Sequence, residues 1–157
     1  MISLSRRNKG FTIVELLIVI VVIGILALLV ITTYSTIQQK ARNSKRASDV
    51  KSLQTNIEAY FTQSGHYPSL TDMNTASFLT TNMKSLDQNA LIDPSNPTQS
   101  KTFVASPVAK SYAFQPKQSD GSTSCESDDT TCVMYTLTAT YEGQYNGTST
   151  SIAKNLD

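Results

Sequence analysis

The sequence is poor in the residues from which most catalytic centres are built. Its 157 residues include one histidine, His66, two cysteines, Cys125 and Cys132, and no tryptophan. A structural zinc site usually takes four nitrogen or sulfur ligands, so a zinc site is not expected. The sequence also lacks a Ser/His/Asp or Cys/His arrangement and a glycine-rich phosphate loop. We therefore expect that the protein is not an enzyme and uses no cofactor, and that His66 is structural.

Acidic residues are scarce in the first third of the chain. The leader carries Arg6, Arg7 and Lys9 without an acid, and residues 40–51 carry five bases against Asp49 alone. From residue 52 onward, ten acidic residues face five basic ones. Charge blocks of this kind act on partners and association rather than on the fold. The pattern predicts a basic neck at residues 40–51, followed by an acidic region.

Charge is almost missing between Phe11 and Ile31, where only Thr12, Glu15 and Gly24 interrupt the apolar side chains. As a helix this stretch rises about 31 Å, close to the roughly 30 Å hydrocarbon core of a bilayer. A secretory signal would have a shorter apolar region and an Ala-x-Ala-like cleavage site, which is absent here. On hydropathy alone, the stretch predicts a single-span membrane anchor.

Glu15 does not fit a plain anchor, because an ionisable side chain inside a membrane is costly and usually has a partner. The dipole of a helix that begins near Phe11 contributes about 1 kcal/mol or less, too little to offset dehydration of the ion. A cation is therefore required. Cleavage between Gly10 and Phe11 would create one, since the new α-amino group of a neighbouring chain could meet this carboxylate.

The segment "KGFTIVELLIVI" resembles the class III signal of type IV pilins and type II secretion pseudopilins. The resemblance implies that a membrane peptidase removes residues 1–10 by cutting after Gly10 and then methylates the new N-terminal Phe11. It also implies that Glu15 is needed for subunit assembly. This family often has a proline soon after the glycine that matches Gly24, but Thr32 and Thr33 stand there, so a proline kink is not expected.

The resemblance implies an α+β pilin fold, with a long N-terminal helix packed on a small antiparallel sheet. Residues 11–34 would form the transmembrane and filament-core half, and residues 35–64 the amphipathic half. The residues themselves support the second half, because apolar side chains recur at helical spacing at Val50, Leu53, Ile57, Tyr60 and Phe61. Gly65 and Pro68 then end the helix.

Residues 65–142 are expected to form the globular head. Helical spacing predicts a second helix over residues 71–86, and "DPSNP" predicts a turn. Strands are expected at residues 102–105, 111–115 and 133–141, with residues 112–115 paired to part of the last one in a hairpin whose long tip carries the cysteines. Residues 143–157 have little apolar content and predict a polar, mobile tail.

The two cysteines lie seven positions apart in the polar region. If the head is exported, a disulfide between Cys125 and Cys132 is favoured over unpaired thiols, and the resemblance implies that such a loop lies at a filament surface. Acidic residues crowd this loop and could hold Ca²⁺, although loops of this kind are usually only solvated. The residues concerned are Asp120, Glu126, Asp128 and Asp129.

The basic neck admits three interpretations. Its residues, Lys45 and Arg46 among them, could contact the acidic head of a neighbouring subunit, DNA phosphates, or only solvent near lipid headgroups. We favour the contact between subunits, since heads stack over necks in filaments of the family that the chain resembles. Asn146 begins an Asn-Gly-Thr sequon for N-glycosylation, which is a weak signal.

Together, the residues and the resemblance predict a structural pilin that polymerises through its N-terminal helix into an extracellular type IV pilus. Adhesion, motility or DNA uptake would be its role. A periplasmic pseudopilus of a type II secretion system and a competence filament are the alternatives. The resemblance implies as partners other copies of the chain, the prepilin peptidase and methyltransferase, an assembly platform protein with its ATPase, and minor pilins. The precursor would cross the cytoplasmic membrane once.

Overall fold

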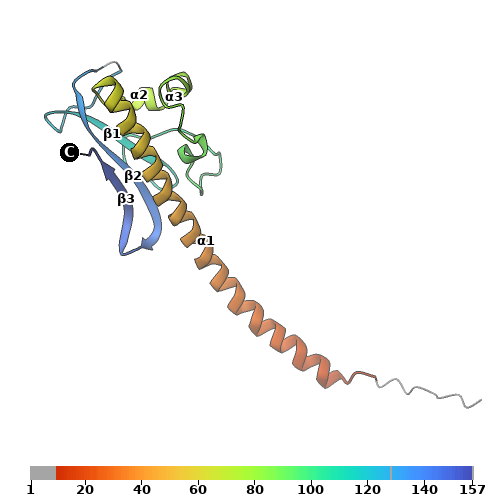
Figure 1. Ribbon diagram of the computed structural model, residues 1–157. Coiled ribbons are helices and arrows are strands. Elements are labelled where there is room, and N and C mark those ends of the chain that lie inside the picture. Colours follow the sequence, from red (N-terminus) through yellow and green to blue (C-terminus); the bar gives the residue numbers. More distant parts are fainter. Residues whose placement is uncertain (1–9, 128, 157) are drawn as a thin grey trace, which may run out of the picture. The chain divides into compact units, whose positions relative to one another are not determined.

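The computed structural model describes residues 10–127 and 129–156. The chain divides into two compact units, residues 1–38 and residues 39–157. Helix α1 (Ile13–Ser64) begins in the first unit and ends in the second (Figure 1). The predicted leader lies outside the described residues except for Gly10, as does Asp128 of the predicted acidic loop.

The end of α1 agrees with the sequence-based prediction. Ser64 is the last helical residue, and Gly65 follows with φ = 78°. The Gly65 amide donates to the carbonyl oxygen of Phe61 at 2.8 Å, which closes the last turn. Glycine is favoured here because residues with a Cβ rarely adopt this left-handed backbone conformation.

A three-stranded antiparallel sheet forms the second layer of the second unit. Its strands are β1 (Tyr112–Gln118), β2 (Cys132–Tyr145) and β3 (Thr148–Lys154), and β2 lies in the middle. Tyr112 pairs with Ala139 and Gln115 with Thr136, which confirms the predicted hairpin. The α+β arrangement of a long N-terminal helix and a small sheet is that expected from the sequence.

The prediction of a mobile polar tail after Gly143 is wrong, because this region forms the end of β2 and all of β3. Asn146 and Gly147 make the two-residue turn between these strands, with φ = 51° and 81°. Positive φ at both central residues defines the hairpin turn that Asn-Gly favours most. Pairing with a central strand thus orders a segment that is too polar to form a core of its own.

The predicted helix over residues 71–86 is divided into two short helices, α2 (Leu70–Met73) and α3 (Ala76–Asn82), followed by the 3₁₀ helix η1 (Gln88–Leu91). Asn74 ends α2, and its side-chain amide pairs with the backbone of Phe103, donating at 3.0 Å and accepting at 2.7 Å. This amide pairing competes with helix continuation. The predicted strand at residues 102–105 is only a single bridge between Val104 and Ala113.

The core of the second unit lies between the second half of α1 and the sheet (Figure 1). The apolar stripe predicted on α1 is confirmed, since Val50, Leu53 and Ile57 are buried and Tyr60 and Phe61 pack at its edge. The buried partners from the rest of the unit include Tyr67, Phe103, Tyr112, Phe114, Tyr135 and Leu137. From β2 it contains Cys132, Tyr135, Leu137 and Ala139, so it holds the first part of this strand against α1.

Candidate functional site

The first turn of α1 is organised by Thr12 and Glu15. The Thr12 amide and hydroxyl both donate to Oε2 of Glu15, at 3.1 and 2.9 Å, and the Glu15 amide donates back to the Thr12 hydroxyl at 3.2 Å. The Leu16 amide donates to the Thr12 carbonyl. This reciprocal pattern is a capping box, in which a Thr and a Glu three residues later satisfy the free amides of a helix start. The spacing Thr-x-x-Glu is the sequence signal for a capping box. This signal was not used to predict the helix start.

Gly10 and Phe11 precede the helix. Neither belongs to a helix or strand, and the Phe11 side chain is 82% exposed. The predicted scissile peptide bond therefore lies in irregular backbone immediately before the cap. Because the capping box lies C-terminal to that bond, removal of residues 1–10 would leave Thr12 and Glu15 in the chain.

The described residues do not cover the apolar half of α1. Its large side chains from Ile13 to Ile31 expose between 48% (Val22) and 88% (Ile13) of their surface. By length and composition, α1 contains a segment able to cross a membrane. An apolar surface of this extent marks a membrane or protein interface rather than a surface that faces water.

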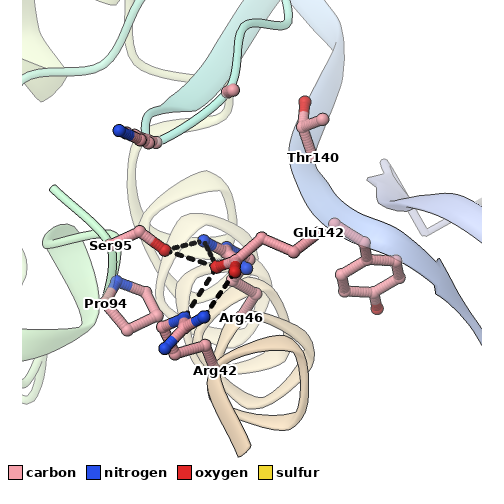
Figure 2. A pocket seen from close by; sticks show the side chains of 9 residues that line it. Arg42, Arg46, Pro94, Ser95, Thr140 and Glu142 are labelled. Atoms are coloured by element: carbon pink, nitrogen blue, oxygen red, sulfur yellow. Dashed lines mark hydrogen bonds and ion pairs between the residues drawn. The ribbon is translucent and has the colours of Figure 1, made fainter. Parts of the chain in front are cut away.

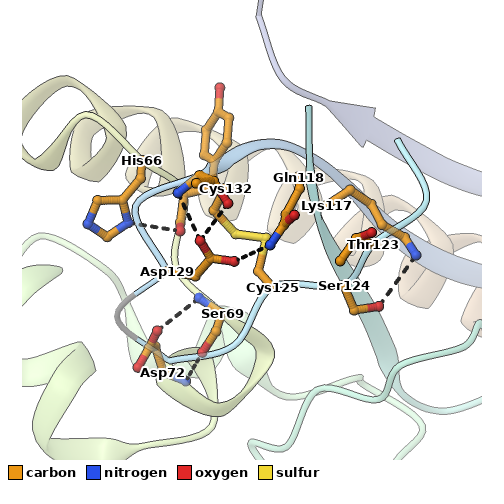
Figure 3. The surroundings of a disulfide bond; sticks show 12 residues. His66, Ser69, Asp72, Lys117, Gln118, Thr123, Ser124, Cys125, Asp129 and Cys132 are labelled. Atoms are coloured by element: carbon orange, nitrogen blue, oxygen red, sulfur yellow. Dashed lines mark hydrogen bonds between the residues drawn. A yellow bond between two sulfur atoms is a disulfide. The ribbon is translucent and has the colours of Figure 1, made fainter. Parts of the chain in front are cut away.

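Cys125 and Cys132 form the disulfide that the sequence suggested, with their Cα atoms 5.8 Å apart (Figure 3). Both cysteines are buried, and the Cys132 carbonyl accepts from the Tyr67 amide at 2.8 Å. The bond therefore ties the acidic loop to the start of β2, close to the C-terminal end of α1. His66, in the same region, packs edge-on against Tyr60, and its Nδ1 lies 3.2 Å from the Tyr67 carbonyl.

The carboxylates around the disulfide hold turns. Asp120 accepts from the Ser122 and Thr123 amides at 2.9 and 2.8 Å, and these bonds together with the Thr123 hydroxyl lower the pKa of Asp120. Asp129 accepts from Thr131 and from Gln118, which lowers its pKa as well (Figure 3). Among the described residues, no group of three or more His, Cys, Asp or Glu residues is placed to hold a metal ion.

The predicted neck residue Arg46 is not available to a neighbouring subunit, because it is 1% exposed. Its Nε donates to Asp93 at 2.7 Å, its Nη1 donates to Asn43 at 2.7 Å, and its Nη2 donates to Asp93, Ser95 and Glu142. Lys45 forms an ion pair with Asp49 one helical turn later. The charges of these two residues are thus compensated within their own chain, which corrects the interpretation of Arg46 as an exposed contact residue.

Glu142 is the centre of this network, which we call the neck clamp and which comprises Arg42, Asn43, Arg46, Asp93, Ser95 and Glu142. Figure 2 shows Arg42, Arg46, Ser95 and Glu142 with the bonds between them. Arg42 pairs with the Glu142 carboxylate through two nitrogens. The Asn43 side chain donates to the Glu142 carbonyl at 3.1 Å and accepts from the Glu142 amide at 3.0 Å. The bond from Arg42, with those from Ser95 and Arg46, lowers the pKa of Glu142 to about 2. No local sequence pattern connects Glu142 or Asp93 with residues 42–46, so sequence reasoning missed both.

Comparison with known proteins finds similarity in the N-terminal part of the chain. The family model for the prokaryotic N-terminal methylation motif matches residues 5–31. The type II secretion system core protein G of Dickeya chrysanthemi is 35% identical over 65 residues, which are 41% of this chain and 42% of that protein. The same protein of Escherichia coli is 36% identical over 64 residues, 41% of this chain and 44% of that protein.

The type IV major pilin protein PilA of Myxococcus xanthus is 36% identical over 63 residues, which are 40% of this chain and 29% of that protein. The chain thus spans less than half the length of these curated relatives, and no solved structure matches it significantly. The N-terminal part of the chain is thus similar to a methylation-motif family and to the corresponding part of a type IV major pilin and of type II secretion core proteins.

Proposed function

We propose that the protein is a structural subunit that polymerises through α1 into an extracellular type IV pilus, serving adhesion, motility or DNA uptake. The observation that carries this proposal is the uncovered apolar half of α1, which begins with a carboxylate at Glu15. A surface of this kind must be covered by lipid before assembly and by other copies of the chain after it.

Cleavage after Gly10 would give Phe11 a free α-amino group, which the resemblance suggests is then methylated. In the filament, this cation from one copy would compensate Glu15 of another. Lipid is as apolar as the helix, so burial alone provides little preference for helix contacts over lipid. Pairing of the buried carboxylate with a cation supplies the specific preference, because an unpaired ion in an apolar bundle is costly.

The partners that follow are further copies of the chain, a prepilin peptidase and methyltransferase, an assembly platform protein with its ATPase, and minor pilins. The precursor would be anchored in the cytoplasmic membrane with its head outside the cytoplasm, where the disulfide between Cys125 and Cys132 can form. We propose neither a catalytic role nor a cofactor, and Ca²⁺ at the acidic loop stays a minor alternative.

A periplasmic pseudopilus is the second candidate. Two of the relatives named above are core proteins of type II secretion systems, and their identity to this chain is close to that of the pilin. The N-terminal helix serves both assemblies equally well. A competence filament is a third candidate, although the arginines of the neck clamp are paired within the chain.

Shearing cells that produce the protein separates the candidates. The released material is pelleted, and the N-terminus and intact mass of the protein are measured. A pilin is expected in this pellet as a chain that starts at Phe11, heavier by one methyl group and lighter by two hydrogens for the disulfide. The same processed chain found only in the membrane fraction would favour the pseudopilus. A chain that still starts at Met1 in both fractions would contradict processing and assembly alike.

A further inference from the structure

A cavity of about 390 Å³ opens over the neck clamp, where Thr140–Glu142 of β2 lie beside α1 (Figure 2). Its lining combines side chains from α1, β2 and two loops. The residues are Arg42, Arg46, Pro94, Ser95, Ala109, Lys110, Thr140, Tyr141 and Glu142. A volume of this size is sufficient for a side chain or small molecule.

The charge around this cavity is unbalanced. Asp93 and Glu142 compensate Arg46 and Arg42 through the ion pairs of the neck clamp. Lys110 is exposed, and its ammonium group forms no hydrogen bond or ion pair with any of the described residues. The lining therefore carries one uncompensated positive charge. Arg42 adds a partly exposed guanidinium, with 31% of its side chain exposed.

The loop at the start of β2 carries the opposite charge. Cys132 begins β2 and bonds to Cys125, beside which Glu126 is exposed. Asp120 and Asp129 accept hydrogen bonds within turns. Among the described residues, none forms a hydrogen bond or ion pair with the Glu126 carboxylate. The Cys125 amide donates to the Pro116 carbonyl, and Lys110 of the cavity is six residues from Pro116, so about 20 Å separates this loop from Lys110 at roughly 3.3 Å per residue.

A polymer that grows by addition of identical subunits along a helix needs two different, complementary surfaces on each subunit. The head offers such a pair, a cationic cavity beside Thr140–Glu142 of β2 and an acidic loop held by a disulfide at the start of the same strand. From residue 52 onward, acids outnumber bases by ten to five, so a cationic cavity is a distinctive target on an acidic head. Complementary charges of this kind fix the orientation of one subunit relative to the next and disfavour incorrect orientations.

We propose that the cavity of one subunit receives the Glu126 carboxylate of a second copy, with Lys110 and Arg42 as its cationic partners. This contact rests on the proposed function, because it positions heads that the N-terminal helices bring together. In this proposal, the exposed Lys110 takes the place of the buried Arg46, which the sequence had suggested as the contact residue between subunits. The contact also assigns a role to the disulfide, which restrains the loop that carries Glu126.

Charge reversal in full-length protein tests the contact. Lys110→Glu and Glu126→Lys are each expected to lower the yield of sheared filaments about tenfold, and the double variant is expected to recover most of it. Lys101→Glu is the matched control, because Lys101 is exposed and its ammonium only donates to Gln88. The proposal is overturned if Lys110→Glu assembles as well as this control, or if the double variant assembles no better than the poorer single variant.

Zero-length cross-linking gives a second readout on wild-type protein in membranes or filaments. A carbodiimide joins an ammonium and a carboxylate that are in contact by an amide bond, with loss of water to the reagent. A peptide that links Lys110 to Glu126 can only come from two copies. Within one chain, Cys125 hydrogen-bonds to Pro116, which is six residues from Lys110, and this span of about 20 Å is too long for a zero-length link. Wild-type filaments with an N-terminus at Phe11 but without this link would overturn the contact between heads and leave the proposed function intact.

Discussion

At the scale of single residues, Glu142 connects the sheet to the helix, and its ionisation is part of the stability of the head. In the folded protein its pKa is about 2, chiefly because Arg42 donates to it, against an ordinary value of 4.5. The unfolded chain therefore takes up the proton first as the pH falls. The stabilisation is complete above about pH 4.5 and is lost as the pH falls towards 2.

We predict that acidification from pH 5 to pH 2.5 lowers the melting temperature of the detergent-solubilised protein more than it lowers that of Glu142→Gln. Glutamine still accepts hydrogen bonds from Arg42 but has no proton equilibrium in this range. Because the Glu142 side chain is 29% exposed, a difference of about 1–2 kcal/mol in the free energy of unfolding is expected. Parallel melting curves of the two proteins across this pH range would contradict the assignment.

The burial of Arg46 is a feature at the same scale that residue type alone does not predict. A basic residue in a polar sequence is usually exposed, and Arg46 follows Lys45 in a run that resembles a solvated surface. Its burial depends on Asp93 and Glu142, which lie 47 and 96 positions away in the chain. A contact of that range leaves no trace in the local pattern, so the neck had to be interpreted as a surface.

At the scale of elements, the predictions that were confirmed depend on local signals. Gly65 and Pro68 ended α1 at the predicted place, and the alternation of Val133–Tyr141 identified the centre of β2 and its pairing with β1. The errors arose where contacts distant in sequence decide the structure. Asn74 breaks the second helix by pairing with Phe103, and pairing with β2 orders β3. The pair Asn146-Gly147 was a local hairpin signal that had been considered only as a glycosylation sequon.

The turn at Asn146-Gly147 supports a prediction about β3. Gly147 has φ = 81°, so Gly147→Ala introduces a Cβ in a left-handed conformation and is expected to destabilise the hairpin by about 1–2 kcal/mol. Hydrogen exchange of the β3 amides should become faster, while the core segment of α1 around Leu53 keeps its protection. Ser149→Ala is a suitable control at an exposed position of the same strand. Unchanged exchange in β3 of the Gly147 variant would show that the turn does not determine its pairing.

At the scale of the whole molecule, the two units differ in how their apolar side chains are kept from water. The second unit buries its apolar side chains in its own core, whereas the apolar side chains of the first unit remain exposed in the isolated chain. The first unit therefore depends on lipid or on other copies for its environment. Its composition and the Gly10-Phe11-Glu15 spacing made this recognisable from sequence, while the capping role of Thr12 and Glu15 emerged only from the structure.

Glu15 has two separable properties. It accepts hydrogen bonds in the cap, and it carries the negative charge that we propose pairs with a neighbouring amine. Glu15→Gln retains an acceptor for Thr12 and loses the charge, whereas Glu15→Ala loses both. If the charge is required for assembly, both variants should be cleaved normally but should give at least about tenfold fewer filaments in cells without wild-type protein. Normal filaments from Glu15→Gln and few from Glu15→Ala would instead show that the cap is what matters.

The neck clamp also has a mechanical consequence. Arg42, Asn43 and Arg46 lie within the first turns of α1 that belong to the second unit, and they share five hydrogen bonds with the single residue Glu142. A pull transmitted along the helix reaches these bonds before it reaches the apolar core around Leu53. Because they share one anchor, they carry tension in parallel rather than yielding one after another. The head is thus fastened to its helix at the place where a load on the filament would enter it.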